Sequence, residues 1–147
     1  MGMFNGMAIS GSGLTAQGYR MDIISENLAN IDTTRTSDGT PYRRKMVTFE
    51  ERGERTEFSS ALQHASKRYG HQGVKVTGVY EDYNSDLVKA YDPSHPDADE
   101  NGYVYYPNVN TVQEMTDLID ASRSFEANAT AFDATKNMMM KALSMGK

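Results

Sequence analysis

Apolar residues recur at seven-residue spacing at both ends of this chain, and this repeat constrains the possible fold more than any other feature. The N-terminal repeat consists of Met7, Leu14, Met21 and Leu28. The C-terminal repeat consists of Leu118, Phe125, Phe132 and Met139, with Ser122, Ala129 and Leu143 at a neighbouring helix position. A strict seven-residue apolar repeat favours helices that supercoil around a partner. The sequence therefore predicts N- and C-terminal helices that pack as an antiparallel coiled coil.

The N-terminal helix is expected over residues 4–30, and it is rich in glycine. Its glycines are Gly6, Gly11, Gly13 and Gly18. Each glycine costs a helix up to ~1 kcal/mol relative to alanine. Because an isolated helix of this composition is unstable in water, we expect this segment to fold only when a partner covers its apolar stripe.

The C-terminal helix is expected over residues 111–145. Two starts are compatible with the sequence: Asn110 can cap the helix, or Thr111 and Glu114 can form a capping box. A helix of this length would span about 50 Å at ~1.5 Å per residue. Such a length is typical of a coiled coil or a helical bundle.

The middle of the chain differs in composition from both ends. All 4 prolines and all but one of the 9 tyrosines lie between positions 35 and 108. Alternating or β-prone residues predict strands over 43–49, 74–80, 87–91 and 103–106. The polar segment 50–70 is predicted to be mobile. The chain is thus expected to comprise an N-terminal helix (1–34), a Tyr- and Pro-rich strand–loop region (35–108) and a C-terminal helix (109–147).

Composition excludes several classes of function. The chain has no cysteine, which excludes disulfides, thiolate catalysis and cysteine-based zinc sites. A net charge of -5 argues against nucleic acid as a partner. No stretch is apolar enough to cross a membrane, so we expect no direct membrane insertion. Because the first basic residue is Arg20 and glycines interrupt the preceding segment, no cleaved signal peptide is expected.

One loop carries acidic residues in a pattern that partly matches a metal-binding site. Residues 97–102 match the first half of a calcium-binding loop, but the twelfth position is Asn108 instead of glutamate. His95 with Asp97 and Asp99 could alternatively serve a metal-dependent hydrolase. The simpler interpretation is a polar turn with its corner at residues 101–102. We therefore expect no metal, no cofactor and no catalytic residue, because nothing in the sequence resembles a nucleophile elbow, a phosphate loop or a paired-carboxylate site.

Two short motifs at the ends of the chain resemble a known family. Residues 27–33, NLANIDT, are similar to the NxANxxT signature of flagellar axial proteins, and residues 121–128 are similar to that family's C-terminal EAN signature. The signature positions are Asn27, Leu28, Ala29, Asn30 and Thr33 at one end, and Phe125, Glu126, Ala127 and Asn128 at the other. In the middle, residues 91–109 resemble the proximal-rod members of the basal-body rod proteins.

This resemblance implies a structural subunit of the flagellar proximal rod, the drive shaft that carries torque from rotor to hook. It implies polymerisation through the terminal helices, contact with other proximal-rod proteins, the distal rod and the membrane-ring adaptor, and export by the flagellar type III apparatus to the periplasm without a cleaved signal. A plausible role for Asn27 and Asn30 is to satisfy backbone groups where the first helix ends. The alternative function is a soluble helical-hairpin module that binds a signalling partner.

Overall fold

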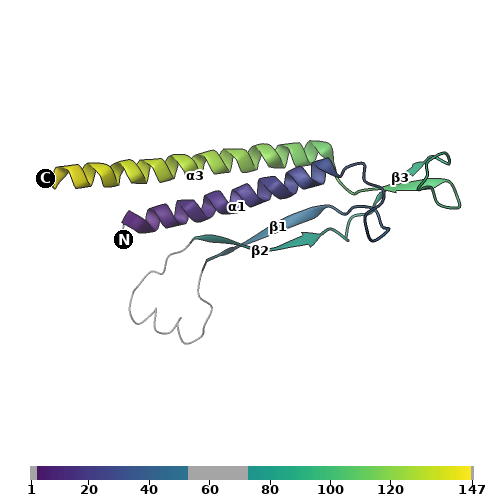
Figure 1. Ribbon diagram of the computed structural model, residues 1–147, viewed down its shortest axis with the longest axis horizontal. Helices are drawn as coiled ribbons and strands as arrows, with labels where there is room; N and C mark the ends of the chain where they lie inside the picture. The colour runs from purple at the N-terminus through teal and green to yellow at the C-terminus, as the bar shows by residue number, and fades with distance from the viewer. Residues whose placement is uncertain (1–2, 53–72, 147) are drawn as a thin grey trace, which may run out of the picture. The chain divides into compact units, whose positions relative to one another are not determined.

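The computed structural model describes residues 3–52 and 73–146, which form two long helices and short strands (Figure 1). The elements are α1 (Met3–Ala29), β1 (Lys45–Glu51), β2 (Val74–Glu81), β3 (Val88–Tyr91), β4 (Tyr103–Tyr106) and α3 (Thr111–Met145). The prediction of a mainly helical chain with a small β-containing middle is confirmed, and both helix ranges are correct to within one residue. Most of the segment 50–70 lies outside the described residues, so its predicted mobility stays a prediction.

The described residues divide into two compact units. Unit 1 contains the described residues of 1–19, 49–77 and 121–147, and unit 2 contains 20–48 and 78–120. Since α1, α3, β1 and β2 each run through both units, every unit combines a piece of each helix with a piece of the first sheet. Each compact unit is therefore built from segments that are far apart in the sequence.

In unit 1, α1 approaches α3 through its glycines. A Cβ atom placed on Gly6 would lie 3.6 Å from Thr135 Cγ2, and one placed on Gly13 would lie 2.8 Å from Asn128 Oδ1. The residue on α3 decreases by seven as the residue on α1 increases by seven, so the two helices run in opposite directions here. The glycines that weaken α1 as an isolated helix thus allow close approach of its partner.

Small and polar residues of α3 contribute to its interface with α1. Ser122, Ala129 and Leu143 were expected to flank the apolar repeat, yet Leu143 is 71% exposed. The structure places the positions four residues before the apolar repeat in the interface. These positions are occupied by Glu114, Ala121, Asn128 and Thr135. Asn128 and Thr135 make the closest contacts with the glycines of α1, and Phe125 of the apolar repeat lies 4.0 Å from a Cβ atom placed on Gly18. The predicted packing role of the apolar repeat stays a prediction.

The start of α3 uses one of the two expected caps. The Asn110 side-chain Oδ1 accepts hydrogen bonds from the backbone N–H groups of Val112 (3.0 Å) and Gln113 (3.3 Å). The alternative capping box is wrong, because the Glu114 carboxylate takes its partners elsewhere in unit 2. Asparagine capping satisfies donors that the first turn of a helix leaves unpaired.

The strands form two separate two-stranded sheets, β1–β2 and β3–β4. In the second sheet the strands are antiparallel, with Val88 opposite Tyr106 and Tyr91 opposite Tyr103. The four predicted strands are confirmed, with ends that differ by up to two residues. Gly102 at the loop between β3 and β4 has φ of +79°, which confirms the predicted tight corner at 101–102.

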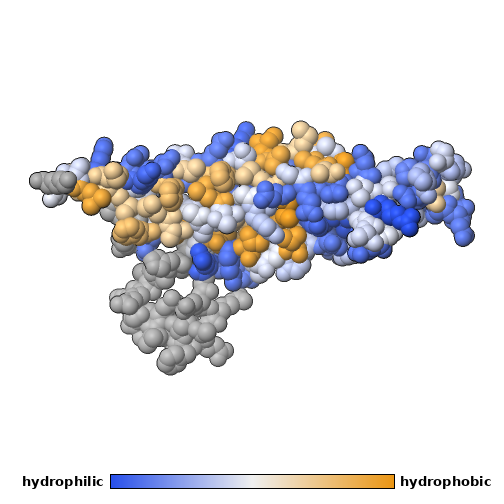
Figure 2. All heavy atoms as spheres, in the orientation of Figure 1, coloured by the Kyte–Doolittle hydropathy of each residue, from blue (hydrophilic) through white to orange (hydrophobic). Residues whose placement is uncertain are grey.

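The apolar core is small and contains polar groups. The buried apolar side chains are Ala16, Ile23, Ile24, Tyr42, Val104, Val109 and Ala121. Three polar or charged side chains are also buried, namely Asn27, Asp82 and Glu114. Many larger apolar side chains of the helices and strands stay at the surface. Figure 2 shows hydrophobic patches on the face that it presents. Among the described residues, no helix has the length and apolar character needed to cross a membrane.

The glycine contacts of α1 give a matched pair of substitutions. Gly11→Ala should raise the free energy of unfolding by ~0.5–1 kcal/mol, because nothing lies within 4 Å of a Cβ atom there. Gly13→Ala should lack this gain or destabilise the chain, because the new methyl group meets the Asn128 amide. Urea unfolding followed by circular dichroism measures both changes.

The Gly13 effect can be isolated by removing its neighbour. In an Asn128→Ala background, Gly13→Ala should behave like Gly11→Ala, since the obstructing amide is gone. Equal effects of the two glycine substitutions in the unaltered chain would show that α3 does not approach α1 at Gly13.

Candidate functional site

The most fully buried polar side chain of α1 is Asn27, which is 1% exposed and lies in unit 2. Its Oδ1 accepts a hydrogen bond from Lys45 N (2.9 Å), and its Nδ2 donates one to Lys45 O (2.9 Å). Both bonds are made to the backbone of a single residue at the start of β1. An antiparallel neighbour strand offers a donor and an acceptor in the same way. The Asn27 amide therefore joins the helix to the sheet as a short piece of strand would.

The second buried polar group is Glu114, near the start of α3. Asn27 Nδ2 donates to Glu114 Oε2 at 3.0 Å, and Arg44 Nε donates to Glu114 Oε1 at 2.6 Å. A carboxylate that is 1% exposed needs such partners, because an unpaired buried charge is costly. The same three residues thus join α1, α3 and the segment that leads into β1.

Tyr42 completes the buried part of the site. Its hydroxyl donates a hydrogen bond to Asn27 Oδ1 at 2.9 Å. Burial raises the pKa of the Tyr42 phenol, and the negative charges of Glu26, Glu114 and Glu81 raise this pKa further. The hydroxyl therefore stays protonated and available as a donor throughout the neutral pH range. We call Asn27, Tyr42, Arg44, Lys45 and Glu114 the polar network.

Ion pairs surround the polar network at its partly exposed edge. Asp117 accepts hydrogen bonds from Arg20 (3.3 Å) and from Arg44 (3.4 Å). The Lys45 ammonium pairs with Glu26. Throughout unit 2 no buried side-chain polar atom lacks a hydrogen-bond partner, which is the condition for a polar core to be stabilising.

A turn after β2 is held to this network through Asn108. Asn108 Oδ1 accepts a hydrogen bond from Arg44 N (2.9 Å), while its Nδ2 donates to Asp82 O (3.0 Å). The Asp82 carboxylate accepts three hydrogen bonds from Asn84 N, Ser85 N and Ser85 Oγ. Hydrogen bonds from Ser85 lower the pKa of Asp82 below its ordinary value.

The remaining N-terminal signature residues lie at the end of α1. Asn30 Nδ2 donates to Glu26 O (2.9 Å), and Thr33 Oγ1 donates to Asn30 Oδ1 (3.1 Å). Leu28 is half-buried and Ala29 is exposed. Asn30 and Thr33 therefore close the turn that leaves the helix, next to the polar network that Asn27 supplies.

The C-terminal signature residues lie in unit 1, on α3. Asn128 is half-buried, bonds to Ser124 O (2.9 Å) and faces α1 at Gly13. Phe125, Glu126 and Ala127 are exposed. Phe125 also reaches α1, because a Cβ atom placed on Gly18 would lie 4.0 Å from its Cε2 atom. Two of the four signature residues therefore contact α1, whereas Glu126 and Ala127 are exposed.

The apolar repeats occupy intermediate positions between core and surface. Phe125 is exposed; the other members, Met7, Leu14, Met21, Leu28, Leu118, Phe132 and Met139, are half-buried. Larger apolar exposure occurs near both chain ends in unit 1, at Phe4, Met138, Met140, Leu143 and Met145. Each repeat thus retains apolar surface that residues 3–52 and 73–146 do not cover.

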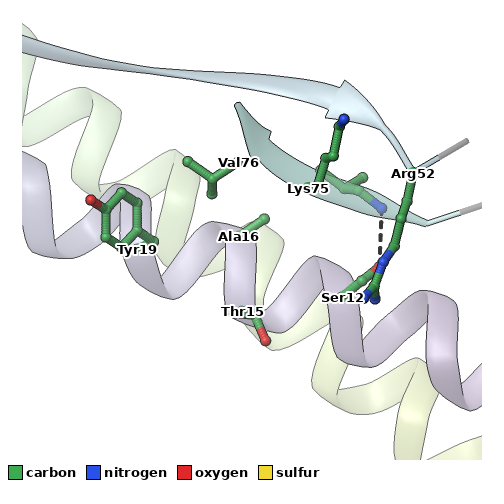
Figure 3. Close-up of a pocket in the computed structure, with 8 residues that line it drawn as sticks. Ser12, Thr15, Ala16, Tyr19, Arg52, Lys75 and Val76 are labelled. Atoms are coloured by element: carbon green, nitrogen blue, oxygen red, sulfur yellow. Dashed lines mark hydrogen bonds between the residues drawn. The ribbon is translucent and has the colours of Figure 1, made fainter. Parts of the chain in front are cut away.

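A groove of about 630 Å³ runs beside α1 in unit 1 (Figure 3). It is lined by Ser12, Thr15, Ala16, Tyr19, Arg52, Val74, Lys75 and Val76. Ser12 Oγ accepts a hydrogen bond from Val74 N (3.0 Å), which attaches β2 to the helix at one end of the groove. None of the described residues that line it carries a carboxylate or an imidazole.

The acidic loop at 97–102 uses its carboxylates to shape the backbone. Asp97 Oδ2 accepts a hydrogen bond from Thr34 Oγ1 (2.8 Å), and His95 Nδ1 accepts one from Asp97 N (3.1 Å). Asp99 Oδ1 accepts bonds from Asn101 N and Tyr103 N. Across residues 3–52 and 73–146, no three histidine or carboxylate side chains are grouped as metal ligands. These contacts support the polar-turn interpretation of the loop.

Sequence reasoning missed four members of the polar network as a site, namely Tyr42, Arg44, Lys45 and Glu114. One signal was available for Glu114, which stands four residues before Leu118 and seven before Ala121. A charged residue at an interface position of a seven-residue repeat indicates a specific polar contact. No comparable signal existed for Tyr42, because its contact with Asn27 depends on the path of the chain after α1.

Comparisons with known proteins find matches along the whole chain. Residues 7–35 match the family model described as flagella basal body rod protein, and residues 100–145 match the C-terminal model of the flagellar basal body rod FlgEFG proteins. The chain is 49% identical to the flagellar basal-body rod protein FlgC of Bacillus subtilis, over 100% of both chains. It is 42% identical to the FlgC protein of Borreliella burgdorferi, over 99% of this chain and 98% of the relative. Identity to the Escherichia coli O6:H1 FlgC protein is 39% over 100% of both chains.

The buried phenol allows a test of the polar network. Tyr42→Phe should lower the free energy of unfolding by ~1 kcal/mol, because Asn27 loses one donor but keeps its bond from Lys45 N. Tyr91→Phe removes the same atom from a ring that is 68% exposed and should change stability by less than ~0.5 kcal/mol. Urea unfolding compares the two variants; equal losses would show that the Tyr42 hydroxyl makes no specific contribution.

The turn at Asp82 gives a prediction for pH. Since the folded-state pKa of Asp82 lies below its ordinary value of 3.8, its stabilising contribution is present at neutral pH and is lost as pH falls through the acidic range. Asp82→Asn should therefore destabilise the chain at neutral pH, and the difference from the unaltered chain should shrink on acidification. Asp86→Asn removes one negative charge at a nearby exposed position and serves as the control for charge loss alone. A pH-independent difference at Asp82 would contradict the hydrogen-bond account.

Proposed function

The chain belongs to the FlgC family of flagellar basal-body rod proteins, and we propose that it is a structural subunit of the proximal rod. In this role it forms part of the shaft that carries torque from the rotor to the hook, and it catalyses no reaction. The observation that carries the proposal is similarity over the full length of both chains, which includes the segments that form the two helices.

The terminal helices supply the contacts for polymerisation. Apolar side chains near both chain ends are exposed in unit 1, among them Phe4, Met138, Met140, Leu143 and Met145. Exposed apolar surface of this extent is typical of an interaction site. Covering ~300 Å² of it on assembly would contribute about 7 kcal/mol at ~25 cal/mol per Å², before the cost of ordering the chain ends. Neighbouring subunits therefore stabilise the glycine-rich end of α1 as the rod forms.

Within each subunit the two helices pack as an antiparallel coiled coil. The opposite directions of α1 and α3 in unit 1 and the seven-residue spacing of the Gly6 and Gly13 contacts support this arrangement. The half-buried repeats, Met7 to Leu28 and Leu118 to Met139, form the edge of the coiled coil and are completed by helices of adjacent subunits. Heterologous contacts of this kind generate open helical assemblies.

The family signatures divide into two roles. Asn27, Leu28, Ala29, Asn30 and Thr33 shape the end of α1 and its attachment to β1. Phe125, Glu126 and Ala127, which are exposed on α3, meet neighbouring subunits, while Asn128 contacts Gly13 within the chain. The division of the chain into residues 1–34, 35–108 and 109–147 describes an inner helical core with an outer strand–loop region.

Membership of the rod family supports assembly with other rod components, and we propose the specific partners on that basis. They are other proximal-rod proteins, the distal rod and the adaptor to the membrane ring, together with the flagellar type III export apparatus. Export by that apparatus places the subunit in the periplasm without a cleaved signal peptide. Neither nucleic acid nor a membrane is a partner, in keeping with a net charge of -5.

Substitutions in the apolar repeats test the proposal. Leu28→Asp and Phe125→Asp should each abolish swimming while the amount of subunit in the cell stays unchanged. Contact with neighbouring subunits in the rod would bury the new carboxylate without a partner, and this cost prevents assembly. Asn137→Asp adds the same charge at an exposed polar position of α3 and should leave swimming intact. Motility in soft agar and immunoblots of whole cells measure both quantities.

Imaging of basal bodies separates assembly from other causes of lost motility. Basal bodies from a deletion strain should lack the rod, and the unaltered gene should restore it. An intact rod in the deletion strain, or normal swimming of both repeat variants, would contradict the proposed function.

A further inference from the structure

The contacts between α1 and α3 in unit 1 do not by themselves choose one alignment of the helices. The two closest lie seven residues apart and place glycine against a short side chain, Gly6 at Thr135 and Gly13 at Asn128. Gly18 makes a looser contact, 4.0 Å from Phe125 Cε2. A shift by one repeat would bring Gly6 opposite Asn128 and Gly13 opposite Ala121. Glycine would again face a small residue, so steric fit is similar in both alignments.

The shifted alignment would also be compatible with charge. It brings Arg20 opposite Glu114, where a cation and a carboxylate attract each other. In the observed alignment the Arg20 guanidinium instead bonds to Asp117 (3.3 Å), and the Glu114 carboxylate bonds to Arg44 and Asn27. Neither the small residues nor the helix charges therefore exclude the shift.

The groups that do exclude it belong to the polar network. Asn27 would move about 10 Å along α3 at ~1.5 Å per residue and would face Pro107, which precedes the helix. Its hydrogen bond to Glu114 would be lost. Because Asn27 is also bonded to both backbone groups of Lys45 and to the Tyr42 hydroxyl, any displacement of α1 must break or carry along these contacts.

We propose that the polar network is a register lock, with Asn27 as its key residue, which selects one of two sterically similar alignments of α1 on α3. A single buried asparagine fixes helix register in coiled coils by the same physical principle, since a slip leaves its amide without partners. α1 is one continuous helix from Met3 to Ala29, so an axial shift of its backbone at Asn27 would also displace Gly6 and Gly13 along α1's own axis.

Disulfide trapping reports the alignment directly, because the chain has no cysteine of its own. The pair Gly6→Cys/Thr135→Cys reports the observed alignment, since a Cβ atom on Gly6 lies 3.6 Å from Thr135 Cγ2. The pair Gly6→Cys/Asn128→Cys reports the shifted one. Disulfide formation requires Cβ atoms about 4 Å apart, whereas the two alignments differ by about 10 Å. Each purified full-length double-cysteine variant can therefore form its disulfide only when the helices adopt the alignment that the variant reports.

With the network intact, the first pair should oxidise and the second should give at least about tenfold less disulfide. Asn27→Leu removes the hydrogen bond from Asn27 to Glu114 but leaves the Glu114 carboxylate, which can pair with Arg20 in the shifted alignment. This substitution should raise the disulfide yield of the Gly6→Cys/Asn128→Cys pair at least about tenfold. Tyr42→Phe should give a smaller increase, and Asn137→Leu, at an exposed position of α3, should give none. Yields are read from non-reducing gels after mild oxidation of dilute protein.

Three results would overturn the register lock. The first is equal oxidation of both pairs with the network intact. The second is exclusive oxidation of the first pair in the Asn27→Leu chain. The third is failure of both pairs in that chain, which would make Asn27 necessary for helix association itself instead of for its alignment. All three leave the proposed rod function untouched, because motility and rod imaging test that function separately.

Discussion

Two hydrogen bonds between the buried side-chain amide of Asn27 and the backbone of Lys45 are the interaction on which the rest of unit 2 depends. They attach the end of α1 to the start of β1 and leave the same amide in contact with Glu114 on α3. Elements that are distant in the sequence thus meet at one residue. The apolar core around it is small, so satisfied polar bonds, instead of a large apolar interior, define how these elements meet.

This arrangement explains why the helices carry so few large residues where they touch. Glycine at positions 6 and 13 brings the α1 backbone close to α3, and its cost to helix stability is offset by that contact. The larger apolar side chains stay half-buried at the edge, where neighbouring subunits of a rod can cover them. A subunit that is specified by polar bonds and completed by its neighbours suits a protein that becomes fully ordered on assembly.

Much of the fold was predictable because its signals are local. Proline-free, heptad-spaced ends predicted both helices, and alternation predicted strands such as β2. The closest contacts of α3 with α1 were not predictable from apolar character, because Asn128 and Thr135 make them as small partners of glycine. The polar network escaped prediction for a different reason: Tyr42 and Arg44 reach Asn27 and Glu114 only after the chain has turned, and that path leaves no mark in sequence spacing. The family signature marked Asn27 as a candidate site residue but did not reveal its hydrogen-bond partners.

Hydrogen exchange of backbone amides in the purified chain tests the central claim most directly. The amide of Lys45 donates to Asn27 Oδ1, and that of Arg44 donates to Asn108 Oδ1, so both depend on side chains and not on a regular ladder. We predict that these two amides are among the slowest to exchange, and slower than those around Gly6 in α1. Exchange at Lys45 and Arg44 as fast as in an exposed turn would contradict the view that the polar network organises this protein.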